Sequence, residues 1–224
     1  SGKSITGFSI IGLVDSPGEI IGGTIKFKGE DLNDLSNEQM QHVRGNRIAM
    51  IFQDPMMTLN PVLRIETQMI EAIQAHDNKI SREDARIRAR DALGLVGISS
   101  PDERLRAYPH QFSGGMRQRV SIAIAMLNRP DLIIADEPTT ALDVTIQGQV
   151  ISEMQKLCRE TKTALLWITH DLAVIAGIAD RVCVMYAGRI VEQGLVANTI
   201  ANPLHPYTQG LMGSVPSQNQ RGKP

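Results

Sequence analysis

Three residues at the start of the chain are of the types, and in the order, that bind phosphate groups. Gly2, Lys3 and Ser4 precede apolar residues at positions 5, 8, 11 and 13, a spacing that predicts a helix. They match the last three positions of the P-loop pattern G-x-x-x-x-G-K-[ST], whose first five positions are missing. Amides at such a helix start attract phosphate, Lys3 would supply charge to the β- and γ-phosphate oxygens, and the Ser4 hydroxyl would ligate magnesium. A helix that merely opens with Gly-Lys-Ser is the plainer alternative, so the assignment depends on the rest of the chain.

Two apolar segments that end in polar residues carry the next candidates. Residues 132–135 predict a buried strand, which Asp136 and Glu137 follow directly, and residues 164–168 predict a second strand that leads to His170. Open α/β sheets place their active sites at the carboxyl ends of strands. Asp136 is therefore a candidate for holding magnesium, Glu137 for polarising an attacking water, and His170 for contacting a γ-phosphate. An acidic turn and a histidine that starts a helix are the alternative interpretation.

A third candidate site is a capped helix start. Ser113 precedes Gly114, Gly115 and a helical pattern, so it predicts an N-cap and a second helix terminus able to bind an anion. The alternative is an ordinary capped helix with a basic beginning. In that alternative the helix would be destabilised, because Arg117 and Arg119 oppose the helix dipole unless an anion or a carboxylate neutralises them.

The spacing of apolar residues predicts the elements that position these candidates. Residues 132–135 and 164–168 are separated by apolar residues at helical spacing between positions 146 and 157. This alternation is typical of a parallel sheet with both faces covered. Further expected elements are strands at 24–27 and 47–52, helices at 66–76 and 81–96, and a hairpin at 182–186 and 189–192. The last twenty or so residues, which contain prolines, predict a loosely packed tail.

Composition and charge narrow the class of protein. The hydrophobic set is 42% of 224 residues and 19 residues are glycine, which is typical of a folded globular protein. Because 23 basic residues are balanced by 24 acidic ones, the chain as a whole does not attract nucleic acid or anionic lipid. The longest apolar runs, 122–127 and 182–187, are far shorter than the ~18 residues that cross a bilayer. Cys158 and Cys183 are isolated, which favours a reducing compartment and two packed thiols.

Taken together, these residues resemble the ATP-binding cassette of ABC transporters over the whole chain. Residues 2–4 correspond to the end of the P-loop, Ser113-Gly114-Gly115 to the signature motif, and His170 to the switch histidine. The other matching motifs are a Q-loop at Phe52-Gln53-Asp54-Pro55, a Walker B motif at Asp136-Glu137-Pro138-Thr139 and a D-loop at Ala141-Leu142-Asp143. The resemblance implies that Gln53 senses the γ-phosphate and contacts magnesium, and that Asp143 contributes to the nucleotide site.

The resemblance also implies a fold, an α/β P-loop NTPase core of the RecA-like type with a mainly parallel sheet and an inserted helical subdomain. The expected divisions are 1–61 with 113–194 for the ATPase core, 62–112 for the helical subdomain, and 195–224 for a Pro-containing C-terminal tail. The family's opening strands, its adenine-stacking aromatic residue and the first part of the P-loop should precede Ser1 and are absent. Without the strand that leads into the P-loop, we expect unpaired edges at 132–135 and 164–168, and weak or no ATP binding by these 224 residues.

Within the family, the chain is most similar to the ATPases of oligopeptide, dipeptide and nickel importers. The segments that carry this similarity are F-S-G-G-M-R-Q-R at 112–119, M-M-T-L-N-P at 56–61 and N-P-L-H-P-Y-T at 202–208. The resemblance implies an ATPase that uses ATP and Mg²⁺ and pairs head to tail with a second cassette, so that residues 2–4 of one copy and 113–115 of the other enclose one nucleotide. It further implies transmembrane permease subunits, a solute-binding protein acting through them, no nucleic-acid partner, and a cytoplasmic position on the inner face of the membrane.

Three alternatives stay open. The chain could be a non-catalytic fragment of such a cassette, since half of the P-loop is absent. It could be an ABC ATPase of DNA repair or chromosome organisation, although no heptad repeat or Cys cluster lies between Gln53 and Ser113. A paired cassette associated with translation would require two sets of motifs, and the sequence has one.

Overall fold

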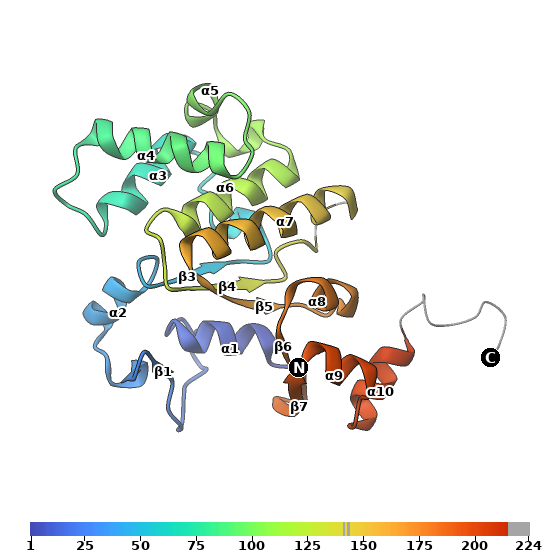
Figure 1. Ribbon diagram of the computed structural model, residues 1–224. Coiled ribbons are helices and arrows are strands. Elements are labelled where there is room, and N and C mark those ends of the chain that lie inside the picture. Colours follow the sequence, from blue (N-terminus) through green and yellow to red (C-terminus); the bar gives the residue numbers. More distant parts are fainter. Residues whose placement is uncertain (141, 143, 215–224) are drawn as a thin grey trace. The chain divides into compact units, whose positions relative to one another are not determined.

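The computed structural model describes residues 1–140, 142 and 144–214, and the chain divides into two compact units (Figure 1). One unit is Gly7–Trp167, and the other joins Ser1–Thr6 to Ile168–Pro224. The described α-helices are α1 (Lys3–Ile10), α2 (Asn37–Val43), α3 (Ile65–Gln74), α4 (Arg82–Leu95), α5 (Pro101–Leu105), α6 (Gly114–Met126), α7 (Val144–Thr161), α8 (Leu172–Ile178), α9 (Val196–Ala201) and α10 (Pro206–Gly213). The described strands are β1 (Lys26–Phe27), β2 (Glu30–Asp31), β3 (Ile48–Ile51), β4 (Leu132–Asp136), β5 (Ala164–Ile168), β6 (Arg181–Tyr186) and β7 (Arg189–Leu195).

A three-stranded sheet with the order β3-β4-β5 positions the acidic residues. β3 and β4 are parallel, with Ile48 opposite Leu132 and Ile51 opposite Ala135. The carboxyl ends of these two strands therefore meet at the same edge of the sheet. All three strands lie within two residues of the bounds that the apolar runs predict, so this part of the sequence analysis is confirmed.

The expected unpaired edge at residues 132–135 is wrong. β4 lies between β3 and β5 and is hydrogen-bonded to both, whereas β5 has no second neighbour among the strands of residues 1–140 and 144–214. The composition of a strand indicates that it is buried, but its order in the sheet depends on long-range pairing. The sequence pattern therefore could not tell the central strand from the edge strand.

The apolar core of this unit lies between the sheet and two long helices. In Figure 1, α6 and α7 cover one face of β3, β4 and β5. Ile51 and Ile133 from the sheet and Val150 from α7 are all 0% exposed. Burying an aliphatic side chain of this size stabilises the fold by about 1.5–3 kcal/mol. The apolar spacing predicted between positions 146 and 157 thus faces the core, as a helix over a sheet requires.

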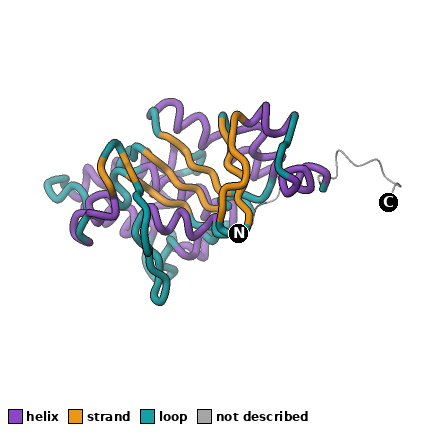
Figure 2. Tube along the Cα trace, turned by 90° about the horizontal axis from the view of Figure 1, so that it is seen from below, coloured by secondary structure: helices purple, strands orange, loops and turns teal. Residues whose placement is uncertain are grey.

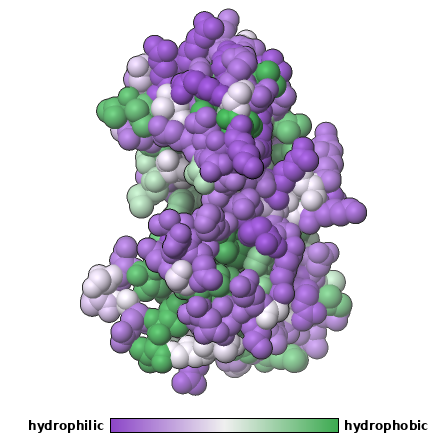
Figure 3. Space-filling model, turned by 90° about the vertical axis from the view of Figure 1, so that its left-hand side faces the viewer, coloured by the Kyte–Doolittle hydropathy of each residue, from purple (hydrophilic) through white to green (hydrophobic). Residues whose placement is uncertain are grey.

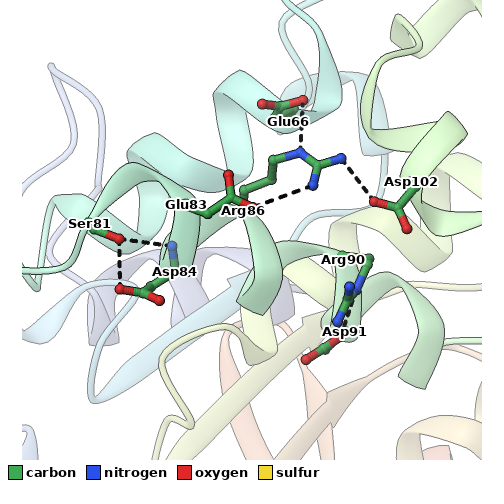
Figure 4. Close-up of polar contacts among 8 residues, drawn as sticks. All are labelled: Glu66, Ser81, Glu83, Asp84, Arg86, Arg90, Asp91 and Asp102. Atoms are coloured by element: carbon green, nitrogen blue, oxygen red, sulfur yellow. Dashed lines mark hydrogen bonds and ion pairs between the residues drawn. The ribbon is translucent and has the colours of Figure 1, made fainter.

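Residues 62–112 hold α3, α4, α5 and a 3-10 turn at Pro109–Gln111 and contain no strand, so their all-helical content is confirmed. Ser81 caps α4, because its hydroxyl accepts a hydrogen bond from the Asp84 amide at 3.0 Å. Arg86 of α4 lies between Glu66 of α3 at 3.9 Å and Asp102 of α5 at 2.9 Å, so one guanidinium group links the three helices (Figure 4). The division of this segment from the core as a separate subdomain stays a prediction.

The predicted hairpin is confirmed in the other unit. β6 and β7 are antiparallel with Tyr186 opposite Arg189, and Figure 2 draws the strands in orange. The two residues of the turn, Ala187 and Gly188, have φ angles of 48° and 76°. Positive φ at both central residues is the geometry of the tight hairpin turn that matches the natural twist of the strands.

The expected loosely packed tail is wrong for residues 206–213, which form α10, and the rest of that tail, residues 215–224, lies outside the described residues. Thr208 and Met212 of α10 are buried, and His205 caps that helix by accepting a hydrogen bond from the Tyr207 amide at 3.1 Å. Pro206 occupies the first turn of α10, where proline favours a helix start because its missing N–H would have no intrahelical partner. Proline was therefore a helix-start signal here rather than a loop signal.

The surface drawn in Figure 3 is largely hydrophilic, with apolar side chains gathered in separate patches. Within the part of the chain that the structure describes, every helix is too short or too polar to cross a lipid bilayer.

Candidate functional site

The carboxyl ends of β3 and β4 bring two of the candidate catalytic residues, Gln53 and Glu137, together. Gln53 follows β3 and Glu137 follows β4, and the Gln53 amide Nε2 donates a hydrogen bond to Glu137 Oε2 at 3.3 Å. The Thr140 hydroxyl donates to the same carboxylate oxygen at 3.1 Å. Asp136, the last residue of β4, is 4% exposed. The prediction that Asp136 and Glu137 lie at the carboxyl end of a buried strand is confirmed, and Gln53 lies beside Glu137.

Glu137 adopts an unusual backbone conformation. Its φ angle is 45°, in the left-handed region that non-glycine residues seldom occupy. Such a conformation costs about 1–2 kcal/mol for a residue with a Cβ atom, so neighbouring contacts must hold it. The hydrogen bonds from Gln53 and Thr140 are two such contacts, and they fix the direction of the carboxylate.

The contacts that support this turn were not predicted from the sequence. Thr139 is buried, and its hydroxyl accepts a hydrogen bond from Gln147 Nε2 at 3.1 Å. Gln147 belongs to α7, so this bond ties the acidic turn to the helix that follows it. An available signal was the pair Thr139-Thr140, which follows Asp136 and Glu137 after Pro138. Nothing in the pattern of α7 marked Gln147.

The signature residues form a second group within the same unit. Ser113 caps α6, because its hydroxyl accepts a hydrogen bond from the Met116 amide at 3.3 Å, and this confirms the predicted helix start. Gly114 and Gly115 then begin the helix. These residues line an open pocket of about 520 Å³. Its other lining residues are Gly97, Ile98, Ser99, Met116, Arg119, Leu142 and Ile146.

The arginines near the start of α6 have partners inside the chain. Arg117 Nε donates to the Pro109 carbonyl at 3.0 Å, and Arg119 lies 3.5 Å from a Glu153 carboxylate oxygen. A carboxylate therefore neutralises Arg119, whereas the Pro109 carbonyl that accepts from Arg117 carries no charge. For Arg119 the expectation that a bound anion is needed is wrong, and the anion-binding prediction depends on the helix start.

Gly2, Lys3, Ser4 and His170 belong to the unit that joins Ser1–Thr6 to Ile168–Pro224. Lys3 and Ser4 lie in the first turn of α1, as predicted, and Gly2 precedes it with a φ angle of 95° that only glycine adopts readily. His170 lies between β5 and α8. The predicted site residue Asp143 lies outside the described residues.

Two family models match parts of the chain. The model of the ABC transporter family matches residues 1–140, and a model of the oligopeptide/dipeptide transporter C-terminal region matches residues 191–223. The chain is 51% identical over 224 residues to the oligopeptide transport ATP-binding protein OppD of Bacillus subtilis (strain 168). It is 50% identical over 222 residues to the dipeptide transport ATP-binding protein DppD of the same organism. These alignments cover 100% and 99% of the chain but 62% and 66% of the two relatives, so the chain spans less than two thirds of their length.

Two solved structures share the fold. One is described as the dimeric structure of MJ0796, a bacterial ABC transporter cassette, and is 29% identical with a TM-score of 0.74, covering 88% of this chain and 82% of that one. The other is a post-hydrolysis state of the same cassette bound to ADP and Pi, 28% identical with a TM-score of 0.73, covering 86% and 80%. The fold is thus that of a P-loop NTPase, as the sequence predicts. The family match over most of the chain, the order of its motifs and this structural similarity together show that the chain belongs to the ABC transporter family.

Proposed function

We propose that this chain is the ATP-binding and ATP-hydrolysing part of an ABC importer, which couples hydrolysis to the uptake of peptides through separate membrane subunits. The observation that carries the proposal is the contact of Gln53 with Glu137 beside Asp136, at the carboxyl ends of two parallel strands. Relatives named for oligopeptide and dipeptide transport support the peptide substrate over nickel.

The residues at this sheet edge suit a magnesium nucleotide. Asp136 offers a nearly buried carboxylate, and Glu137 and Thr140 add oxygen atoms beside it. Mg²⁺ prefers such oxygen donors and usually takes few of them from the protein. Asp136, Ser4 and Gln53 would hold the ion, which when bound would neutralise charge on the phosphate oxygens.

The chain's own groups divide the remaining work. The amides at Gly2–Ser4 and the Lys3 ammonium bind the phosphates through the start of α1. Glu137 accepts a proton from the attacking water at a carboxylate oxygen, while Gln53 orients that carboxylate and His170 contacts the γ-phosphate. Asp143 contributes to the nucleotide site from the segment before α7.

The signature residues act on a nucleotide bound to a second cassette. Ser113, Gly114 and Gly115 form a capped helix start beside an open pocket, which suits a phosphate group presented from outside the chain. The two structural neighbours are described as dimeric cassettes. Closure of the dimer would exclude water and complete each site, and hydrolysis would reopen it.

The remaining partners follow from the same proposal. The opening and closing of the dimer drives transmembrane permease subunits, and a solute-binding protein delivers peptide to them. The ATPase then lies on the inner face of the cell membrane, held there by the permease.

A mixed dimer tests both the activity and the arrangement. One copy of the protein that contains this chain carries Lys3→Ala and the other carries Gly115→Asp, with different affinity tags. If the signature acts across the dimer, one composite site has both lesions and the other has none, so about half of the ATPase activity remains. The matched control places both substitutions on one copy beside an unsubstituted copy, which leaves no intact site. Equal activity of the two mixtures would contradict the composite site, and an inactive unsubstituted dimer would contradict the ATPase itself.

A further inference from the structure

Arg119 connects the signature helix to two other elements of its unit. Its Nη1 donates to the carbonyls of Gly97 at 3.2 Å and Val96 at 3.4 Å, where α4 ends. Its Nη2 donates to Gln149 Oε1 at 3.0 Å, and Nη1 lies 3.5 Å from Glu153 Oε1. Gln149 and Glu153 lie four residues apart on α7, so they share one face of that helix. One side chain therefore joins α6, α7 and the end of α4.

The surroundings of Arg119 make these contacts stronger than those of an exposed ion pair. Its side chain is 15% exposed and that of Glu153 is 32% exposed. Burial raises the pKa of Glu153, and the charge of Arg119 opposes that rise. A partly buried guanidinium group with several acceptors is costly to remove, because the buried residue Val96 and the partly buried Glu153 would each lose a donor.

The packing around Arg119 leaves little room for movement. A Cβ atom built on Gly97 would lie 2.7 Å from Arg119 Nη1, and Gly97 has a φ angle of 73°. One turn before Arg119 on α6, a Cβ atom built on Gly115 would lie 2.8 Å from Ile146 Cγ2 of α7. Ile146, Gln149 and Glu153 fall on one face of α7, opposite Gly115 and Arg119 on α6. The contact between the two helices is therefore close at both of these points.

We propose that Arg119 is a positioning residue that holds Ser113–Gly115 in register with the first turns of α7 and with the loop at Gly97. This inference deepens the proposed function, because it assigns a residue that aligns the signature with the nucleotide of the second cassette. Arg119 lines the same pocket as the signature but acts through the helix rather than on the phosphates. A small displacement of a binding group can reduce turnover by a hundredfold, so a residue that fixes the register matters even at a distance from the reacting atoms.

Arg86 provides a matched control. Its side chain is 21% exposed, and it joins α4 to α3 and α5 through Glu66 and Asp102, as Figure 4 shows. Arg86 is thus an arginine of similar burial that links three helices, but it does not line the signature pocket. Substituting either arginine removes stabilising contacts, and only the substitution of Arg119 should disturb the signature.

The experiment compares Arg119→Gln, Arg119→Lys and Arg86→Gln in the complete protein with its membrane subunits. We expect Arg119→Gln to reduce kcat roughly ten- to hundredfold, the scale of a small misplacement, while the affinity of the open state for ATP stays the same. Arg119→Lys keeps the charge beside Glu153 and should recover part of kcat. Arg86→Gln should change kcat less than twofold, although its thermal midpoint falls as far as that of Arg119→Gln.

Hydrogen–deuterium exchange without nucleotide separates this proposal from the proposed function. Arg119→Gln should speed exchange of the amides at 114–119 and 146–150, and Arg86→Gln should not. This result is expected whether or not the unsubstituted protein hydrolyses ATP. If Arg119→Gln fails to fold, Glu153→Gln and Gln149→Ala remove its contacts one at a time and should give smaller changes in the same amides. Equal exchange in the Arg119 and Arg86 variants, or a loss of kcat that is equal in both, would overturn the positioning role.

Discussion

Gln53 Nε2 donates a hydrogen bond to Glu137 Oε2 across 3.3 Å, although the two residues lie 84 positions apart in the sequence. The contact forms because each residue follows one of two adjacent parallel strands. A movement of the segment after β3 therefore changes the direction of the Glu137 carboxylate. The proposed sensing by Gln53 has a direct physical route to the proposed base.

Replacing the proposed base, Glu137, should separate ATP binding from hydrolysis. In the complete protein, Glu137→Gln keeps the shape of the side chain but removes its ability to accept a proton. We expect ATP affinity to stay within about twofold, and turnover to fall by roughly 10²- to 10⁴-fold, the usual contribution of a general base. Nucleotide titration and steady-state ATPase measurements check the two effects. Undiminished turnover would remove Glu137 from the mechanism.

A carboxylate introduced at position 53, beside Glu137, should shift the pH dependence of kcat. Gln53→Glu places two acidic side chains within contact distance, and like charges raise the pKa of a carboxyl group. Glu137 would then lose its proton at a higher pH. The acidic limb of the plot of kcat against pH should therefore move to higher pH. Gln53→Ala, which removes the amide without adding charge, should lower kcat and leave the limb in place. Superimposable profiles for the two variants would contradict a direct contact between residues 53 and 137.

The two signature glycines should differ in their tolerance of a methyl group before any partner binds. A Cβ atom on Gly115 would meet Ile146 at 2.8 Å, whereas one on Gly114 would have no neighbour within 4 Å. We expect Gly115→Ala to be less stable than Gly114→Ala by about 1–3 kcal/mol, the usual cost of overpacking. Urea unfolding of the two variants measures this difference. Equal urea midpoints for the two variants would mean that α7 can move away from α6 with little loss of stability.

The C-terminal region should have a stability that depends on one carboxylate. Glu192 accepts hydrogen bonds from the backbone amides of Leu204 at 2.9 Å and His205 at 3.0 Å. These bonds, the Leu204 amide first, lower the pKa of Glu192 below its usual 4.5. The ionised carboxylate therefore stabilises the fold above pH 4.5, and that stabilisation is lost as the pH falls through the lowered pKa.

Glu192→Gln should reduce protection of the α10 amides from hydrogen exchange at pH 7, and the difference from the unsubstituted protein should shrink in acid. Glu160→Gln is the control, since Glu160 forms an exposed ion pair with Lys156 at 4.0 Å and such pairs contribute little. A difference for Glu192→Gln that stayed constant from pH 7 into acid would show that charge is not the cause.

Local patterns in the sequence predicted β3, β4, β5 and the hairpin, the cap at Ser113, and the carboxylates of Asp136 and Glu137 at the end of a strand. These features follow from the spacing of side chains within one element, or from the general rule that parallel strands share an edge. The central place of β4 and the contacts of Arg119 with Gly97 and Glu153 were not predictable in this way. They depend on which helices and strands lie side by side, and no single segment encodes that.

The C-terminal segment is a second case in which the sequence pattern was ambiguous. Proline occurs both in loops and in the first turn of helices, and only the burial of Thr208 and Met212 shows that Pro206 begins a helix. Composition alone therefore gave the wrong answer for α10.

The left-handed backbone of Glu137 has a consequence for how such a chain would change if selection for catalysis were lifted. Glycine adopts a φ angle of 45° without the clash that a Cβ atom brings, so a glycine at position 137 would relieve about 1–2 kcal/mol of strain. The same change would abolish the carboxylate. Under the proposed role of Glu137 as the base, stability and turnover are opposed at this residue, and drift in an unused copy of the gene would favour the glycine.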